Sequence, residues 1–408
     1  MARRLLIFVL KVTKRMLVEV RTKLALGLVT TMGVMFCGCG HPSPAATAAK
    51  ALSDTVDAVP HRRDADDTAR FLAGMPGRPG SPFAGLEASP AWKRHREVLD
   101  QAWAGASESL IAGLNEFQKR ELAAAPLADA PVFYPFGGPD ALTPIVCFPR
   151  SRSYVMVALE PPGTLPTPAK LEKRPLAVYL PELRKTMASV LGRSFFVTRD
   201  MDRQFRGQVT DGLLVPILQI LVRTGHTVNG FRYLTLNDEG EIIERTAGWR
   251  APGKHGNKGV EISYRTDADG STHHLTYFSV NLDDKHLSDN FAFRKYASRL
   301  KGSTTIFKAT SYMVHNKDFS IIREIALSAS SAILQDDSGL PFRLLEDGRW
   351  KVQLYGEYTK PYGSFHFRVQ QDLRLAYQGG GVKPLPMRIG YGYGRVASNL
   401  LLAERAGS

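Results

Sequence analysis

Cysteine is scarce in this chain, with only three among 408 residues. Cys37 and Cys39 stand close together near the amino terminus, and Cys147 lies alone between apolar residues. Three cysteines in these places do not make the disulfide framework of a small secreted domain. We expect Cys147 to be an ordinary buried core residue, because no neighbour in the sequence supplies the base or positive field that a reactive thiolate needs.

Apolar runs long enough to cross a membrane are also missing. Residues 24–36 and 213–222 are strongly apolar, but both segments fall short of the ~20 residues that span a bilayer. The first follows a basic segment and precedes small residues, which is the pattern of a signal peptide. The second predicts a buried helix.

The common catalytic and nucleotide-binding motifs are absent. The sequence contains no Gly-x-Ser-x-Gly, Ser-x-x-Lys or His-Glu-x-x-His pattern. Residues 248–254 have the spacing of a phosphate-binding loop, but His255 replaces the expected Ser or Thr and a predicted strand follows, so we interpret the segment as a basic turn. The glycines at 390, 392 and 394 lack the spacing of a dinucleotide site. We therefore expect no cofactor.

Composition and charge exclude other classes of protein. Hydrophobic residues make up 44% of the chain and charged residues 23%, which is typical of a globular protein rather than a disordered one. The net charge is +14. Residues 1–38 carry seven basic side chains and one acidic one, so only +8 belongs to the other 370 residues. An exported protein with this modest excess is not expected to bind nucleic acid, and a basic surface suits anionic lipid equally well.

The segment Phe36-Cys37-Gly38-Cys39 is similar to a bacterial lipobox. Cys39 fits the lipidated position, with Gly38 before it, whereas Cys37 would place Phe36 where a small residue is required. Lipidation of Cys39 would anchor the chain to a membrane, since each buried methylene contributes ~0.8 kcal/mol. Gly40 favours the outer membrane by the same similarity. The alternative is ordinary secretory cleavage near residues 45–49.

These signals divide the chain into three parts. We expect a signal peptide over 1–38 and a lipidated flexible tether over 39–90, where proline is frequent and large apolar side chains are few. A single globular domain then covers 91–405, with a subdivision near 225 left open.

Periodicity within that domain predicts interleaved helices and strands. The expected helices cover 92–122, 180–191, 213–222, 288–300 and 319–334. The expected strands cover 131–136, 153–159, 231–236, 260–264, 275–280, 350–358, 365–369 and 387–391. This pattern indicates an α+β or mixed α/β fold, with a mixed sheet and packed helices.

Histidines and carboxylates occur together in residues 273–286, and such side chains can bind a divalent metal ion. His273 and His274 are adjacent on a predicted strand and must point to opposite faces. Asp283 and Asp284 fall in a predicted turn, where charged side chains are normally solvated. We therefore expect no metal site.

Two acidic segments are the best candidates for chemistry. Tyr134 and Phe136 precede Asp140 across a Gly-Gly-Pro turn, so they could bind a sugar, with Asp140 either in the site or capping the next helical turn. Asp336 and Asp337 follow the predicted helix 319–334, where their charge is unfavourable to the helix dipole and favours a partner. Paired carboxylates can act as acid and base where burial separates their pKa values.

The phrase Tyr134-Pro-Phe-Gly-Gly-Pro-Asp140 resembles the Tyr-Pro-Phe-Ser-Gly-Pro-Asp motif of a family of uncharacterised bacterial exported proteins and lipoproteins. The phrases at 334–341 and 352–356 are also similar to that family, so the resemblance covers most of 130–405. This chain has Gly137 in place of the usual serine, so no role of that hydroxyl is transferred. The resemblance implies an envelope lipoprotein and adds no mechanism.

Two hypotheses about function follow. The first is a lipid-anchored ligand-binding or scaffolding domain that faces the periplasm or the cell surface, with an envelope glycan or protein as partner. The second is an envelope hydrolase acting on glycan or peptide. Its candidate catalytic residues are Asp140, His274, Asp336 and Asp337.

Overall fold

The computed structural model describes residues 62–193, 211–246, 256–392 and 397–407, all of which belong to one unit, residues 56–408. The signal segment, Cys39 and residues 248–254 lie outside these ranges. Within them, no helix has the length and apolar character needed to cross a bilayer.

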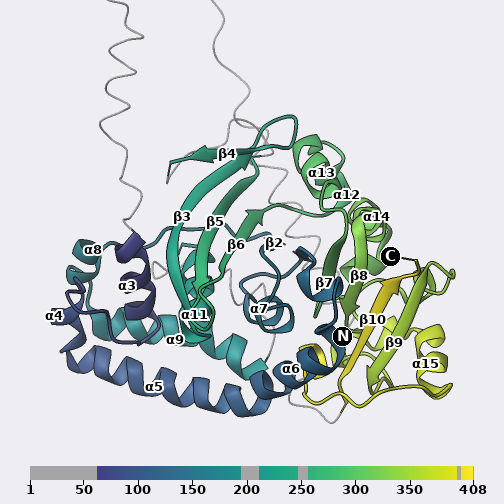
Figure 1. Ribbon diagram of the computed structural model, residues 1–408, viewed down its shortest axis with the longest axis horizontal. Coiled ribbons are helices and arrows are strands. Elements are labelled where there is room, and N and C mark those ends of the chain that lie inside the picture. The colour runs from purple at the N-terminus through teal and green to yellow at the C-terminus, as the bar shows by residue number, and fades with distance from the viewer. Residues whose placement is uncertain (1–61, 194–210, 247–255, 393–396, 408) are drawn as a thin grey trace, which may run out of the picture. The chain divides into compact units, whose positions relative to one another are not determined.

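A single ten-stranded mixed sheet forms the centre of this unit, so the fold is α+β (Figure 1). Its order is β4-β3-β5-β6-β2-β1-β7-β8-β10-β9. The five strands from β6 to β8 are parallel, and β10 is antiparallel to both of its neighbours. No domain boundary near residue 225 divides this sheet. The strands are β1 (Val132–Pro135), β2 (Ser153–Ala158), β3 (His226–Leu236), β4 (Ile242–Arg245), β5 (Lys258–Thr266), β6 (Thr272–Ser279), β7 (Ser303–Phe307), β8 (Ser330–Gln335), β9 (Trp350–Gly356) and β10 (Asn399–Arg405).

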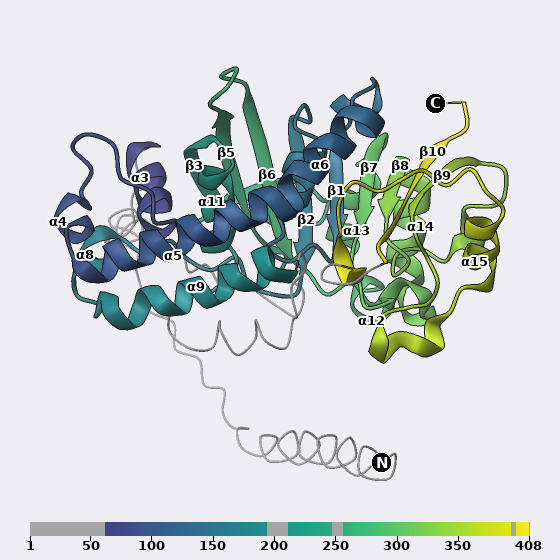
Figure 2. The ribbon, with the colours of Figure 1, turned by 90° about the horizontal axis from the view of Figure 1, so that it is seen from below.

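Helices cover both faces of the sheet. The first face carries α5 (Pro90–Ala106), α6 (Ala112–Phe117), α7 (Leu142–Cys147), α9 (Leu176–Arg193) and α11 (Leu214–Arg223). The second carries α12 (Asp284–Leu287), α13 (Phe291–Ser298), α14 (Ser320–Ala329) and α15 (Gln371–Gln378). Figure 2 shows α5 and α9 side by side along the first face. The described ranges also contain α3 (Arg62–Leu72), α4 (Ala84–Glu87) and α8 (Pro168–Glu172).

Side chains alternate along the central strands, which explains why each face of the sheet carries its own core of packed helices. Tyr134 on β1 packs into the core of the first face, whereas its neighbour Phe133 packs into the core of the second. On β2, Tyr154 and Met156 likewise face the first core and Val155 the second. Strands buried on both faces read as unbroken apolar runs, which is why the sequence located β1 and β2 correctly.

The predicted tether was too long at its carboxyl-terminal end. Residues 62–72 form α3, which packs against β3, and the Asp66 carboxylate accepts a hydrogen bond from the backbone N–H of Val228 at 2.8 Å. Phe71 stacks on Phe83 with ring centroids 4.7 Å apart, and on Trp92 beyond it. A few aromatic anchors therefore bind a segment whose prolines and charges suggested a linker.

Other predicted elements differ from the structure in the carboxyl-terminal third. The segment 319–334 is helical only over Ser320–Ala329 and then becomes strand β8. The predicted strand 365–369 is mostly a 3-10 turn, Gly363–Arg368. The predicted strand 387–391 is irregular, and β7 and β10 were not predicted at all. The helix expected over 92–122 is confirmed as a continuous helical run that includes two π-helical turns, Ser107–Ile111 and Gln118–Leu122.

Candidate functional site at the carboxyl edge of the parallel strands

The order in which the chain adds parallel strands reverses between β1 and β7. The chain passes from β1 to β2 on one side and reaches β7 only later, on the other side. The helix after β1, α7, covers the first face, whereas α14, after β7, covers the second. Loops that leave the carboxyl ends of β1 and β7 therefore diverge at this point. Open α/β sheets bind their ligands at such a switch point.

A buried ion pair joins the two diverging loops. Nζ of Lys308, which follows β7, lies 2.5 Å from Oδ2 of Asp140, which follows β1, and both side chains are at most 5% exposed. The same oxygen accepts hydrogen bonds from the hydroxyls of Tyr134 (2.9 Å) and Thr143 (2.8 Å), and Lys308 also donates to the Thr143 hydroxyl at 2.7 Å. Burial and the Asp140 charge raise the pKa of Tyr134 well above its ordinary value, so it remains a donor.

Asp336 directly follows β8, and its carboxylate binds the loop after the neighbouring strand β7. Its Oδ2 accepts the backbone N–H of Ala309 at 2.8 Å, and its Oδ1 accepts both the N–H and the hydroxyl of Ser338. Burial raises the pKa of Asp336, and the positive charge of Lys308 acts in the opposite direction. Both oxygens of the Asp336 carboxylate therefore accept hydrogen bonds from the two loops that it joins.

Asp337 extends the network to β10. Its two oxygens accept hydrogen bonds from the Tyr312 hydroxyl and from the side-chain amide of Asn399, the first residue of β10. The Asn399 amide oxygen accepts a hydrogen bond from the backbone N–H of Asp337 at 2.7 Å. The side-chain amide of Gln370 donates to the backbone carbonyl of Asp337 at 2.9 Å. Burial and the charge of Asp336 raise the pKa of Asp337 to about 7.

Backbone strain concentrates in the same loops. Every residue other than glycine that has a positive φ, among those described, lies after β1 or β7. Such conformations cost of order 1–3 kcal/mol each and persist only where the surroundings impose them, often at functional sites. The residues are Phe136 (φ 62°), Ala309 (52°), Ser311 (56°) and Tyr312 (55°).

Aromatic rings cover the strained loop after β7. The Tyr391 hydroxyl donates to the carbonyl of Ala309 and accepts the backbone N–H of Ser311. Tyr391 stacks on Tyr362 at a centroid distance of 5.3 Å and contacts Phe365 at 5.5 Å. Phe365 and Tyr391 come from segments that we predicted as strands, and Tyr362 from the turn between two of them.

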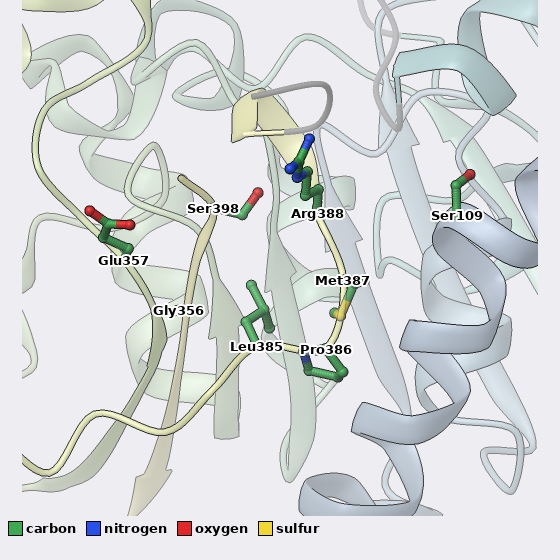
Figure 3. A pocket seen from close by; sticks show the side chains of 8 residues that line it. All are labelled: Ser109, Gly356, Glu357, Leu385, Pro386, Met387, Arg388 and Ser398. Carbon is green, nitrogen blue, oxygen red and sulfur yellow. The ribbon is translucent and has the colours of Figure 1, made fainter. Parts of the chain in front are cut away.

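A cavity of about 650 Å³ opens beyond this network, at the end of β9 (Figure 3). Ser109 from the helices of the first face borders it on one side and Glu357 on the other, with residues 385–388 between them. Ser398, which also borders the cavity, immediately precedes Asn399 of the network. The lining combines apolar side chains with one acid, Glu357, and one base, Arg388, so it suits a polar small molecule.

The predicted site residues do not all meet. The structure brings Tyr134, Asp140, Asp336 and Asp337 to the carboxyl edge, with Phe136 in the turn after β1. His274 lies at the other end of the sheet, because it pairs with Ser153 at the start of β2. Its side chain is half exposed, so it cannot act together with the carboxylates.

Asp336 and Asp337 also stand in a different setting from the one predicted. They follow strand β8 rather than a helix, so the helix-dipole argument for a compensating partner does not apply. Their donors are backbone groups and neutral side chains of adjacent loops.

The remaining candidates have structural roles. His273 is buried and His274 is exposed, as alternation on a strand requires. Asp283 caps α12 by accepting the backbone N–H of His286. No group of three metal-ligating side chains occurs within the described ranges. Cys147 is buried, and burial raises the pKa of its thiol to about 12, which confirms it as an inert core residue.

Two members of the network were not predicted. Lys308 directly follows β7, a strand of three hydroxyl residues, Ile306 and Phe307 that was not predicted, and a lone lysine after a strand is normally solvated. Asn399 opens a strand that the sequence did not reveal. No local signal marks Lys308; only the strand order, which places β7 beside β1, brings it to Asp140.

Compared with protein-family models, curated protein sequences and solved structures, the chain has no match.

Proposed function

We propose that this protein is a lipid-anchored protein of the bacterial cell envelope whose folded domain binds a small ligand at the carboxyl edge of its parallel strands. The observation that carries the binding proposal is the switch point between β1 and β7, where two loops diverge. The cavity at the end of β9 lies at the same edge and falls within the ~300–1,000 Å³ range of small-molecule sites.

The closed polar network favours binding over catalysis. Each oxygen of Asp140, Asp336 and Asp337 already accepts a hydrogen bond from the protein. A general acid or base must reach the substrate. Carboxylates that hold loops instead preorganise a surface, which lowers the entropic cost of binding a ligand.

The envelope location rests on the sequence. The apolar run 24–36 and the Gly38-Cys39 pair support lipidation, and the Tyr134–Asp140 motif supports it by resemblance to exported lipoproteins. Labelled palmitate should enter the wild-type chain and not the Cys39→Ala variant. Equal labelling of both would overturn lipidation at Cys39 without bearing on ligand binding.

Ligand binding is tested by a thermal-shift panel on the purified full chain, with N-acetylglucosamine oligomers, muramyl dipeptide, amino acids and adenosine as probes. We expect at least one probe to raise the melting temperature by mass action. The variant Ser311→Trp, at the carboxyl edge, should lose this shift. Its matched control, Thr272→Trp at the opposite edge, should retain it. A panel without any shift, or a loss only in the control, would overturn the proposal.

The second candidate is a hydrolase that acts on envelope glycan or peptide, and one observation favours it. The pKa of Asp337 is raised to about 7, which suits proton transfer near neutral pH. The test is release of soluble fragments from purified peptidoglycan by the wild type and by Asp337→Asn. Release by the wild type alone would replace the binding proposal with the hydrolase.

A further inference from the structure

A second cavity lies at the end of β9, on the face of the sheet that carries α15 (Figure 1). Its volume is about 440 Å³, within the ~300–1,000 Å³ range of small-molecule sites. It shares Gly356 and Glu357 with the larger cavity, but no residue of the loops 136–143, 308–312 and 336–339 borders it. A ligand in this cavity would therefore be distinct from one held by the loops after β1 and β7.

Two side chains of opposite charge line this second cavity. Glu357 is exposed and Arg374, on α15, is partly buried. Within the described ranges, no hydrogen bond or ion pair engages the Glu357 carboxylate or the Arg374 guanidinium, and none joins the two. Nε of Arg374 is closed off from solvent, so the terminal nitrogens are the ones that a ligand can reach. One positive and one negative group without protein partners complement a ligand that carries both charges.

The backbone fixes the position of Glu357. The preceding residue, Gly356, has φ 80°, and its N–H donates to the carbonyl of Lys383 at 2.9 Å. The N–H of Glu357 itself donates to the carbonyl of Ser398 at 2.8 Å. A Cβ at Gly356 would lie 2.2 Å from that same carbonyl oxygen, so the turn requires glycine. The carboxylate therefore projects from a rigid turn.

Aromatic side chains hold α15 in place and form a wall of the cavity. The hydroxyl of Tyr377, three residues after Arg374, donates to the carbonyl of Tyr355 on β9 at 3.0 Å. The rings of Tyr377 and Tyr358 have centroids 6.0 Å apart, and the Tyr358 hydroxyl accepts the backbone N–H of Gln370 at 3.1 Å. Both tyrosines line the cavity beside the two charges. Such rings suit an apolar side chain of a ligand.

We infer that this second cavity binds an α-amino acid with an apolar side chain. The terminal nitrogens of Arg374 hold the carboxylate, for which the planar guanidinium is well suited. The Glu357 carboxylate holds the ammonium group, and the side chain packs against Tyr358 and Tyr377. A ligand with only one of the two charges would meet a like charge in the same cavity, which favours the zwitterion. Because both groups are fixed before binding, the entropic cost of binding is lowered.

Isothermal titration of the full chain with three matched probes tests this site. L-phenylalanine should bind. L-phenylalaninamide lacks the carboxylate, and 3-phenylpropanoate lacks the ammonium group. Each should bind about 10- to 100-fold more weakly than L-phenylalanine, because one charged group of the protein loses its partner.

Two variants assign the charges. Arg374→Gln should no longer favour L-phenylalanine over its amide, and Glu357→Gln should no longer favour it over 3-phenylpropanoate. The matched controls are Arg265→Gln on β5 and Glu172→Gln on α8, which remove exposed charges far from the cavity in the sequence. Both controls should keep the wild-type preferences.

Absence of L-phenylalanine binding, or equal affinity of the wild type for the three probes, would overturn the amino-acid site, as would an unchanged preference in Arg374→Gln. If a variant does not fold, the three probes on the wild type still decide. Binding that is lost in Ser311→Trp and unchanged in Arg374→Gln would overturn the second site and leave the proposed function standing. Binding of L-phenylalanine that Ser311→Trp retains, with no shift from any other probe of the panel, would overturn the proposed function and support the second site.

Discussion

The two ends of the parallel strands differ in how they treat charge. At the carboxyl edge, Asp140, Lys308, Asp336 and Asp337 are buried and joined by hydrogen bonds across three loops. At the amino edge, His274 is half exposed and its contact with Glu261 is long, at 3.9 Å. His274 thus resembles a group on an ordinary protein surface.

This difference shows where the fold maintains costly features. Buried charges need complete partners, and left-handed residues need surroundings that impose them. The two features occur together at the carboxyl edge, where the loops diverge. His273, at the amino edge, is also buried, but its Nδ1 donates to the Ser151 carbonyl and its ring stacks on Tyr264 at 5.3 Å, so it completes the packing without burying a charge.

The largest effect is expected from breaking the buried ion pair. Asp140→Asn leaves the Lys308 charge without its counter-ion in the interior and should lower the free energy of unfolding by about 3–5 kcal/mol. The matched control is Glu239→Gln, which breaks the exposed pair with Lys295 and should leave the free energy of unfolding almost unchanged. Urea unfolding measures both. Similar losses in the two variants would contradict the account.

Asp337 should make stability depend on pH. Its pKa is raised from 3.8 to about 7 in the folded state, so the folded chain holds this proton more tightly than the unfolded chain does. Stability from this group is full below about pH 4 and is lost as the pH rises towards 7, by a few kcal/mol in total. Asp337→Asn should remove that slope from urea unfolding measured across the range. A variant with an unchanged slope would show that another group is responsible.

A side chain at Gly390 should press on the network. Gly390 has φ 57°, and a Cβ there would lie 2.5 Å from Oδ2 of Asp336, so Gly390→Ala should cost about 2–3 kcal/mol. Gly302→Ala is the control, since Gly302 also has a positive φ (77°) but faces open space. It should cost only about 1 kcal/mol. Equal melting temperatures for the two variants would mean that the Asp336 side chain shifts to make room for the new Cβ at no cost in stability, which would contradict the account.

The smallest effect is expected at the amino edge. His274→Ala removes a half-exposed side chain and should change stability by less than about 0.5 kcal/mol. It should also leave ligand binding in the thermal-shift panel unaltered. A loss of binding in this variant would place a functional group at the wrong end of the strands.

Local pattern predicted most of the sheet but not the segments that change structure midway. The strands β1, β2, β5 and β6 were located because short apolar runs between turns have few alternatives. Residues 319–334 failed because Ser330–Gln335 continues an apolar pattern that fits a helix or a buried strand equally well. Pairing with β7 and β10 decides between them, and a local window carries no such information.

The candidate site was predicted in part for a related reason. Asp140, Asp336 and Asp337 stood out as acids beside glycine turns, although they lie far apart in the sequence. Lys308 did not stand out, and His274 was included because histidine is a versatile catalytic group. Only the strand order brings Lys308 to Asp140 and sends His274 to the other edge, since it is set by long-range pairing.

Hydrogen exchange of the full chain with and without a saturating ligand from the panel tests the central claim most directly. The account predicts that added protection falls on the loops at the carboxyl edge, residues 136–143, 308–312 and 336–339. Protection confined to residues 151–153 and 271–274, at the opposite edge, would contradict it.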